Sequence, residues 1–261
     1  AHRGKDLIMA AEPRPREIAL RAGAPQLSVV IPVFNEEACL PLLFDRLYAA
    51  LDALGMRYEV VFVDDGSADR SAALLREQFE RRRAATRVVL LRRNFGQHAA
   101  LRAGFRHTRG QYIVTLDADL QNPPEEIANI VQRLEEGYDC VGGVRSTRED
   151  SWFRRTASRA ANRLRERTTR IRMTDHGCML RGYHRSLVDV LNQLHDVSAF
   201  LPALAYTLAA KPTEIEVRHE ARAAGMSKYS LLHLARLNFD LMTGFSVAPL
   251  QFLSVIGFVV A

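Results

Sequence analysis

The feature that most constrains the fold is a series of short Val- and Ile-rich runs separated by helical patterns, all between residues 27 and 145. The runs are LSVVIPVF (27–34), YEVVFVDD (58–65), RVVLLR (87–92), YIVTLDAD (112–119) and YDCVGGVR (138–145). They show little polar alternation, which is typical of strands covered on both faces. Between the first two runs, apolar residues recur at three- and four-residue steps from Leu40 to Leu54, and Gly55 is placed to end a helix. The pattern predicts a βαβ series, and hence an α/β domain with a mainly parallel sheet flanked by helices.

Polar side chains follow three of these runs at the point where each strand is expected to end. In open α/β sheets, ligands bind at the carboxyl ends of the strands. The sequence therefore predicts a site built from the pairs Asn35 and Glu36, Asp64 and Asp65, and Asp117 and Asp119.

The segment LDADLQNPPEE (116–126) carries two acids one residue apart. On an extended segment, Asp117 and Asp119 would point to the same side and repel each other unless a cation lies beside them. Hard divalent ions take oxygen ligands, and Gln121 can add a neutral oxygen. The alternative is a helix start with Asn122 as the N-cap, but capping leaves both aspartates without a role. The sequence therefore predicts a divalent-metal site.

The segment VDDGSADRS (63–71) supports two interpretations. Asp65, Gly66 and Ser67 can simply make a turn and cap the next helix. A carboxylate at a strand end can also accept hydrogen bonds from a base or a ribose hydroxyl. Both interpretations stay open on the residues alone. Pro32, which lacks an N–H, is expected to end the hydrogen-bond ladder of the first strand.

Arginine dominates the positive charge of the chain, whose formal net charge is +6. Ten arginines lie between Arg145 and Arg172, which predicts an anionic partner. Part of this run can instead be a solvated helix face, or a basic helix on an anionic membrane surface. We favour a division, with the arginines nearest Arg145 in the site and those from Arg163 onward at lipid headgroups. No nucleic-acid motif accompanies the run, so nucleic acid is not an expected partner.

The cysteines and the chain ends indicate the cellular compartment. Cys39, Cys140 and Cys178 have no metal-ligand spacing and are expected as core or site-wall residues in a reducing compartment. His98 and His176 are interpreted as hydrogen-bonded structural residues, with contact to a sugar as an alternative for His98. Residues 1–26 are expected to form a polar arm without a signal sequence, ahead of a cytosolic domain. The 21 uncharged positions of residues 241–261 predict the start of a truncated membrane region, with a buried C-terminal helix as the alternative.

Taken together and in order, VVIPVFNEE, VVFVDDGSADRS, RNFGQHAALRAGF and LDADLQNPPEE resemble the inverting family 2 glycosyltransferases of the GT-A fold. The chain is most similar to the polyprenyl-phosphate glycosyltransferases of that family. NFGQHAA, DSWFRRTASR, DHGCMLRGYHR and GMSKYS resemble members that use 4-deoxy-4-formamido-L-arabinose. The resemblance implies a GT-A domain over 27–229. It also implies a C-terminal amphipathic, juxtamembrane helix in 230–261 that leads into the membrane region.

The resemblance also implies roles for individual positions. The nucleotide pocket would be lined by Pro32, Phe34, Asn35, Glu36, Asp64, Asp65, Asp117, Ala118, Arg222 and Lys228. Mg²⁺ or Mn²⁺ would be held by Asp119, Gln121 and Asp117. The catalytic centre and the acceptor phosphate would be served by Asp117, Asp119, Arg145, Arg154 and Ser158. Arg222 and Lys228 lie in the segment 219–230, implied to be a mobile loop over the nucleotide, with a plain polar surface loop as the alternative.

The implied reaction is metal-dependent transfer, with inversion, of a sugar from a UDP-sugar to undecaprenyl phosphate. The sugar implied is 4-deoxy-4-formamido-L-arabinose, which serves lipid A modification and polymyxin resistance. Alternatives are another sugar (glucose, galacturonate, N-acetylhexosamine or mannose) or a non-catalytic nucleotide-sugar-binding module. The expected place is the inner membrane, with the catalytic domain on its cytoplasmic face and membrane lipids as partners. A homo-oligomer stays open.

Overall fold

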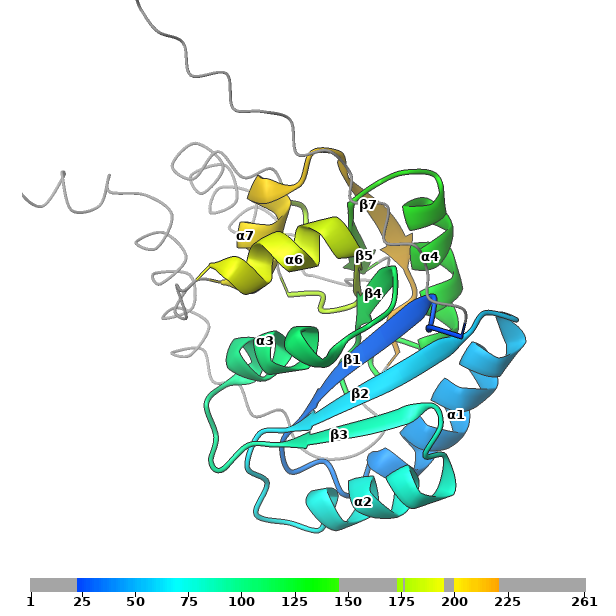
Figure 1. Ribbon diagram of the computed structural model, residues 1–261, viewed down its shortest axis with the longest axis vertical. Coiled ribbons are helices and arrows are strands. Elements are labelled where there is room, and N and C mark those ends of the chain that lie inside the picture. The colour runs from blue at the N-terminus through cyan, green and yellow to red at the C-terminus, as the bar shows by residue number, and fades with distance from the viewer. Residues whose placement is uncertain (1–22, 146–172, 176, 195–199, 221–261) are drawn as a thin grey trace, which may run out of the picture.

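The computed structural model describes residues 23–145, 173–175, 177–194 and 200–220. Its centre is a seven-stranded sheet with strand order β3-β2-β1-β4-β6-β5-β7, and helices cover both faces of this sheet (Figure 1). The described strands pair in parallel, except that β6 is antiparallel to both β4 and β5. The predicted α/β fold with a mainly parallel sheet is confirmed.

The elements have the following bounds. The strands are β1 Leu27–Val33, β2 Tyr58–Asp64, β3 Thr86–Leu90, β4 Tyr112–Thr115, β5 Cys140–Arg145, β6 Arg181–His184 and β7 Pro212–Val217. The helices are α1 Leu40–Ala53, α2 Ser71–Arg81, α3 Gln97–His107, α4 Ile127–Glu135, α6 Arg185–Gln193 and α7 Leu201–Leu208. A single 3-10 turn, η1 Pro124–Glu126, precedes α4. Each predicted run contains a strand, whereas β6 and β7 were not predicted.

Successive residues of β1 face the two layers of the core. Val29 and Ile31 pack in the cluster that includes the leucines of α1 and α4, whereas Val30 packs in the cluster of α3, α6 and α7. The approach of α3 to the sheet is close, since a Cβ at Gly104 would lie 2.3 Å from Val30 Cγ1. The strand alternation thus explains why these runs are apolar on both faces.

Pro32 lies inside β1, which is a correction to the prediction that it ends the ladder. It is the register partner of Val63 in β2. On the other side of β1, pairing with β4 stops at Val30, whose carbonyl accepts from Leu116 N at 3.1 Å. The nitrogen of Pro32 points to the same side as Val30, beyond the end of β4, so no ladder hydrogen bond is lost.

The predicted ends of the chain fall largely outside the described residues. The arm at 1–26 is described only from Gly23, and the predicted juxtamembrane helix at 230–261 is not described. Within the parts that are described, no helix is long and apolar enough to cross a bilayer. The domain boundaries at 26 and 229 stay predictions. All three cysteines are buried and none of them forms a disulfide within the described residues, as expected.

Candidate active site

Hydrogen bonds join the loop after β1 to the loop after β2. Asn35 N donates to Ser67 Oγ at 2.9 Å, and Ala68 N donates to Asn35 Oδ1 at 2.8 Å. Asn35 adopts a left-handed conformation with φ of 53°, which asparagine tolerates better than most residues. Ser67 therefore joins the two loops, and its predicted role as the cap of the next helix is wrong. Glu36 is held in the same way, because its N–H donates to Ser71 Oγ at 2.9 Å.

The two acids at the end of β2 have different surroundings, although both are 3% exposed. The Asp65 carboxylate accepts from Phe95 N at 2.8 Å and from Gly96 N at 2.9 Å. Burial raises the pKa of Asp65. Asp64 Oδ2 accepts from Ser67 N at 3.3 Å, but its Oδ1 is buried without a partner among the described residues. A buried acceptor without a donor is costly, so Asp64 is the acid suited to a ligand N–H or O–H.

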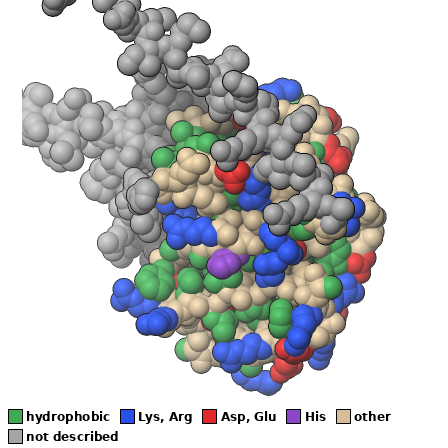
Figure 2. Space-filling model, in the orientation of Figure 1, with side chains coloured by type: hydrophobic (Ala, Val, Ile, Leu, Met, Phe, Trp, Pro, Cys, Tyr) green, Lys and Arg blue, Asp and Glu red, His purple; other side chains and the backbone are tan. Residues whose placement is uncertain are grey.

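Gly66 lets the loop between β3 and α3 pack against the end of β2. Its φ is +72°, and a Cβ there would lie 2.5 Å from the Arg93 carbonyl carbon. The loop itself is basic and exposed, because it carries the exposed Arg92 and Arg93. Figure 2 shows several basic side chains, in blue, on this face of the molecule. The Arg93 guanidinium lies 4.9 Å from the ring centroid of Phe95, whose side chain is 53% exposed. The edge of the site at β2 and β3 is thus positively charged.

The acids after β4 lie in a turn, not on an extended strand as predicted. The strand ends at Thr115, and Ala118 and Asp119 are turn residues. Leu120 is buried with φ of +63°, a conformation that costs a leucine about 1–2 kcal/mol and often marks a functional site. Asp119 Oδ1 accepts from Gln121 N at 3.1 Å. Strand alternation therefore does not set the directions of the two acids, since Asp119 lies in the turn and Asp117 directly precedes it.

Asp117 is oriented by a residue that sequence reasoning missed. Gln97 Nε2, in the first turn of α3, donates to Asp117 Oδ1 at 2.6 Å. Within the described ranges, no three His, Cys, Asp or Glu side chains form a group that could hold a metal ion. The predicted donor set is instead two carboxylates and Gln121, and Mg²⁺ commonly binds through one or two carboxylates plus substrate phosphates. The chemistry of this donor set fits such an ion.

Asn122 does not cap a helix. Pro123 precedes η1 without a side-chain cap, and Asn122 is 3% exposed. Its Oδ1 accepts from Cys178 Sγ at 3.6 Å. The capping alternative for this segment is wrong, since Asn122 instead packs against the turn before β6.

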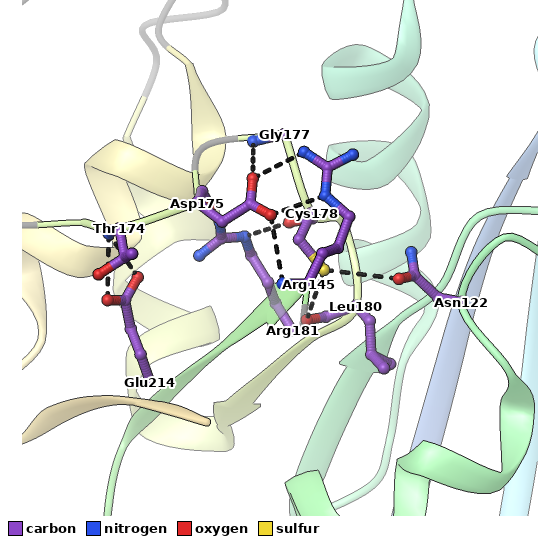
Figure 3. A network of polar contacts seen from close by, with 9 residues as sticks. All are labelled: Asn122, Arg145, Thr174, Asp175, Gly177, Cys178, Leu180, Arg181 and Glu214. Atoms are coloured by element: carbon purple, nitrogen blue, oxygen red, sulfur yellow. Dashed lines mark hydrogen bonds and ion pairs between the residues drawn. The ribbon is translucent and has the colours of Figure 1, made fainter. Parts of the chain in front are cut away.

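Arg145, the last residue of β5, is held by Asp175 (Figure 3). Arg145 Nε lies 2.7 Å from Asp175 Oδ2, and Nη2 lies 2.9 Å from Oδ1. Burial disfavours the charged form of both side chains, but their hydrogen bonds and mutual attraction outweigh this effect. The pKa of Arg145 is therefore raised and the pKa of Asp175 is lowered. The charge of Asp117 also raises the pKa of Arg145, so the two lie within electrostatic reach. Asp175 lies in the motif DHGCMLRGYHR, but no role was predicted for this acid.

Four predicted site residues lie outside the described residues, namely Arg154, Ser158, Arg222 and Lys228. Glu220 is the last described residue before Arg222 and Lys228. Glu220 N donates to Gln121 O at 2.8 Å, and Arg46 pairs with Glu220 and Glu125. Glu220 therefore lies beside the turn that carries Asp119.

His98 is partly buried in the first turn of α3. Its ring meets Phe200 edge-on, with centroids 4.8 Å apart. Its Nδ1 is buried without a hydrogen-bond partner among the described residues, so the predicted hydrogen-bonded role is wrong for this atom. Burial lowers the pKa of His98 to about 4, which keeps the ring neutral at physiological pH. His176 lies outside the described residues.

The pKa of His98 predicts a loss of stability in acid. Between the ordinary value of 6.5 and about 4, the unfolded chain binds a proton that the folded chain does not. Stability therefore falls as the pH drops from 6.5 towards 4, by about 2 kcal/mol after allowance for partial exposure. Urea unfolding at pH 7 and 4.5 should show a smaller acid loss for His98→Gln than for the wild type. Substitution of the exposed His107 by Gln is the control, and equal acid losses in all three proteins would contradict the assignment.

Comparison with known proteins agrees with the class that this fold and site define. The glycosyl transferase family 2 model matches residues 28–191. The chain belongs to this family and is a glycosyltransferase.

Two relatives share the name undecaprenyl-phosphate 4-deoxy-4-formamido-L-arabinose transferase. The protein of Edwardsiella ictaluri (strain 93-146) is 51% identical over 235 residues, covering 90% of the chain and 72% of the relative. The protein of Enterobacter sp. (strain 638) is 51% identical over 236 residues, with the same coverage. The family and its subgroup, expected from the motifs, are confirmed.

Solved structures show the same GT-A fold. Glucosyl-3-phosphoglycerate synthase from Mycobacterium tuberculosis, in complex with Mn²⁺, UDP and glucosyl-3-phosphoglycerate, has a TM-score of 0.63 and 19% identity. The alignment covers 86% of this chain and 79% of that one. A mannosyltransferase from Pyrobaculum calidifontis, in complex with GDP-Man and Mn²⁺, has a TM-score of 0.54 and 20% identity, with coverage of 77% and 59%. At these identities the likeness shows the fold alone.

Proposed function

We propose that the chain transfers 4-deoxy-4-formamido-L-arabinose from its UDP derivative to undecaprenyl phosphate, with inversion. The observation that carries the proposal is the 51% identity over 90% of the chain to transferases of that name. The acids at the carboxyl ends of β2 and β4 supply a site of matching chemistry. The product would serve lipid A modification and polymyxin resistance.

The nucleotide lies, in this proposal, at the ends of β1 and β2. Pro32, Phe34, Asn35 and Glu36 line one side, and the joined loops hold their backbone in place. Asp64 accepts a hydrogen bond from the base or the ribose through its buried Oδ1. Asp65 keeps the loop at Phe95 and Gly96 in place and acts on the nucleotide only indirectly.

Asp119, with Asp117 and Gln121, would hold Mg²⁺ or Mn²⁺, which when bound neutralises the charge on the departing nucleoside diphosphate. Gln97 orients Asp117 through its amide, and Gln121 N orients Asp119. Ala118 lies between the two acids in the turn. We assign Arg222 and Lys228 to the phosphates as well, because Glu220, the last described residue before them, lies beside Gln121.

The acceptor phosphate is an anionic oxygen nucleophile at neutral pH, so the displacement requires no general base. It does require positive charge beside a second phosphate group. We assign this task to Arg145, Arg154 and Ser158. The arginines from Arg163 onward and residues 230–261 would lie at anionic lipid headgroups, on the cytoplasmic face of the inner membrane.

Asp64→Asn is expected to weaken UDP binding about tenfold, because one hydrogen bond to a charged acceptor is lost. Isothermal titration of the metal-loaded protein with UDP measures the effect. The matched control is Asp69→Asn in the same loop. Asp69 Oδ1 accepts from Ser71 N at 2.9 Å and Oδ2 accepts from Glu37 N at 3.1 Å, so both oxygens already have partners in the protein. Equal UDP affinity for Asp64→Asn and the wild type would remove Asp64 from the nucleotide site.

Transfer assays test the proposed function as a whole. The full-length protein, reconstituted in membranes, is supplied with undecaprenyl phosphate, Mg²⁺ or Mn²⁺ and a panel of UDP-sugars. We expect product only with UDP-4-deoxy-4-formamido-L-arabinose and only with metal. Product with UDP-glucose or UDP-galacturonate alone would keep the reaction and replace the sugar. An absence of product with every sugar would overturn the proposal.

A further inference from the structure

The contact between Arg145 and Asp175 fixes a cation at the carboxyl edge of the sheet. Two guanidinium nitrogens bind the two carboxylate oxygens side by side, which defines the plane of the guanidinium as well as its position. The third nitrogen, Nη1, points away from Asp175 (Figure 3). One edge of Arg145 is therefore anchored, and the opposite edge can meet another anion.

The turn that carries Asp175 is shaped around this contact. Gly177 N donates to Asp175 Oδ1 at 2.9 Å. A Cβ at Gly177 would lie only 2.8 Å from Arg145 Nη2, so glycine leaves room for the guanidinium. On the far side, Thr174 N donates to Glu214 Oε1 at 2.9 Å, which ties the turn to β7.

A second arginine, Arg181, donates hydrogen bonds to the same turn. Arg181 is fully buried, and its Nε donates to Cys178 O at 2.8 Å while its Nη2 donates to Asp175 O at 2.5 Å. A buried charge is costly unless it is hydrogen-bonded. Here the hydrogen bonds go to backbone carbonyls of the turn, so Arg181 holds the backbone that positions the Asp175 carboxylate.

The network also reaches the turn after β4. Cys178 Sγ donates to Asn122 Oδ1 at 3.6 Å, and Asn122 follows Gln121 directly. Asp117 carries a negative charge within electrostatic reach of Arg145. An arginine without its own partner would be drawn towards that acid. Asp175 is the acid that Arg145 contacts directly, through two hydrogen bonds from the guanidinium.

We propose that Asp175 is a positioning residue that holds Arg145 with its outer edge towards the phosphate of the lipid acceptor and away from Asp117. This inference rests on the proposed function. Arg145 contacts the acceptor, whereas Asp175, Gly177 and Arg181 act only through Arg145. Preorganisation of the cation lowers the entropy lost when the acceptor binds.

Asp175→Asn tests the proposal, because the amide keeps the shape but sets an NH₂ group or a neutral oxygen against the guanidinium. We expect kcat/KM for undecaprenyl phosphate to fall about 10²-fold, while the Kd for UDP with Mn²⁺ stays at the wild-type value. Asp175→Glu, which keeps the charge, should recover part of the rate. Glu214→Gln is the matched control, since Glu214 holds the turn at Thr174 without touching Arg145, and it should behave like the wild type.

A double-mutant cycle separates positioning from a loosened turn. If Asp175 acts through Arg145, Asp175→Asn in an Arg145→Gln background should cause little further loss. Additive losses, wild-type acceptor kinetics in Asp175→Asn, or an equal loss in Glu214→Gln would each overturn the inference. Should Asp175→Asn not fold, Gly177→Ala displaces the guanidinium without a change of charge and must show the same acceptor-specific loss. A wild-type protein that transfers no sugar would instead reject the proposed function.

Discussion

Asp119→Ala should lower the rate of sugar transfer by at least about 10³-fold, because it removes a carboxylate that would bind the metal ion beside the leaving diphosphate. The fold should persist. Asp119 lies in a turn after β4 and is only partly buried, and its Oδ1 accepts a local hydrogen bond from Gln121 N. The measurements are the transfer rate with saturating substrates and the melting temperature of the variant.

The control for Asp119 is Glu125→Ala, which removes a negative charge six residues further along the same segment. The Glu125 side chain is 42% exposed and pairs with Arg46. It should retain transfer activity. Binding of Mn²⁺ to the UDP complex, followed by electron paramagnetic resonance, gives a readout besides activity, and Asp119→Ala should lose it. Wild-type transfer in Asp119→Ala would exclude Asp119 as a metal ligand.

Glu59→Ala should destabilise the domain by about 4 kcal/mol, the largest effect on stability that we expect. Glu59 is 1% exposed at the start of β2. Its carboxylate accepts from Ser28 Oγ at 2.8 Å and from Arg109 N at 2.6 Å, and it lies 2.8 Å from Arg87 Nε. Alanine would leave Ser28 and two guanidinium groups without their buried partner.

Urea unfolding at neutral pH measures this loss. The control is Glu80→Ala, which breaks the ion pair between Glu80 and Arg83. The side chains of Glu80 and Arg83 are 62% and 67% exposed. That pair should contribute less than about 0.5 kcal/mol. Because Glu59 begins β2 and the site lies at its other end, the folded variant should bind UDP like the wild type. An unfolding free energy within about 1 kcal/mol of the wild type would show that the buried carboxylate is dispensable.

The sheet was partly readable from the sequence. The strands β1 to β5 are apolar runs, because each is covered on both faces. The leucine spacing of α1 predicts the helix that covers one face of the sheet. β6 has only four residues, RGYH, and β7 has the partly polar sequence PTEIEV. β6 is too short to show a period, whereas the alternation of polar and apolar residues from Glu214 to Val217 in β7 is a strand signal that the prediction missed. β6 is a strand because it pairs with β4 and β5 on its two sides, and these contacts join distant parts of the chain.

The candidate site was likewise predictable only in part. Acids at strand ends predicted where the candidate site would lie, since local sequence order sets where each strand surfaces. The difference between Asp64 and Asp65 could not be predicted, because it depends on backbone N–H groups of Phe95 and Gly96 that follow another strand. The turn at Leu120 could not be predicted either, because leucine is not a residue that signals a left-handed conformation.

By itself, the sequence determined the α/β class, the family and the carboxyl edge that carries the acids, because these follow from local periodicity and from motifs in order. Tertiary structure alone decided which carboxylates already accept hydrogen bonds from the protein and which carboxylate holds an arginine. Asp65 is bound by a neighbouring loop, and Asp175 holds Arg145 from 30 residues away. Hydrogen bonds and ion pairs act over a few ångströms of space and not along the chain, so partners that meet only on folding leave no period in the sequence.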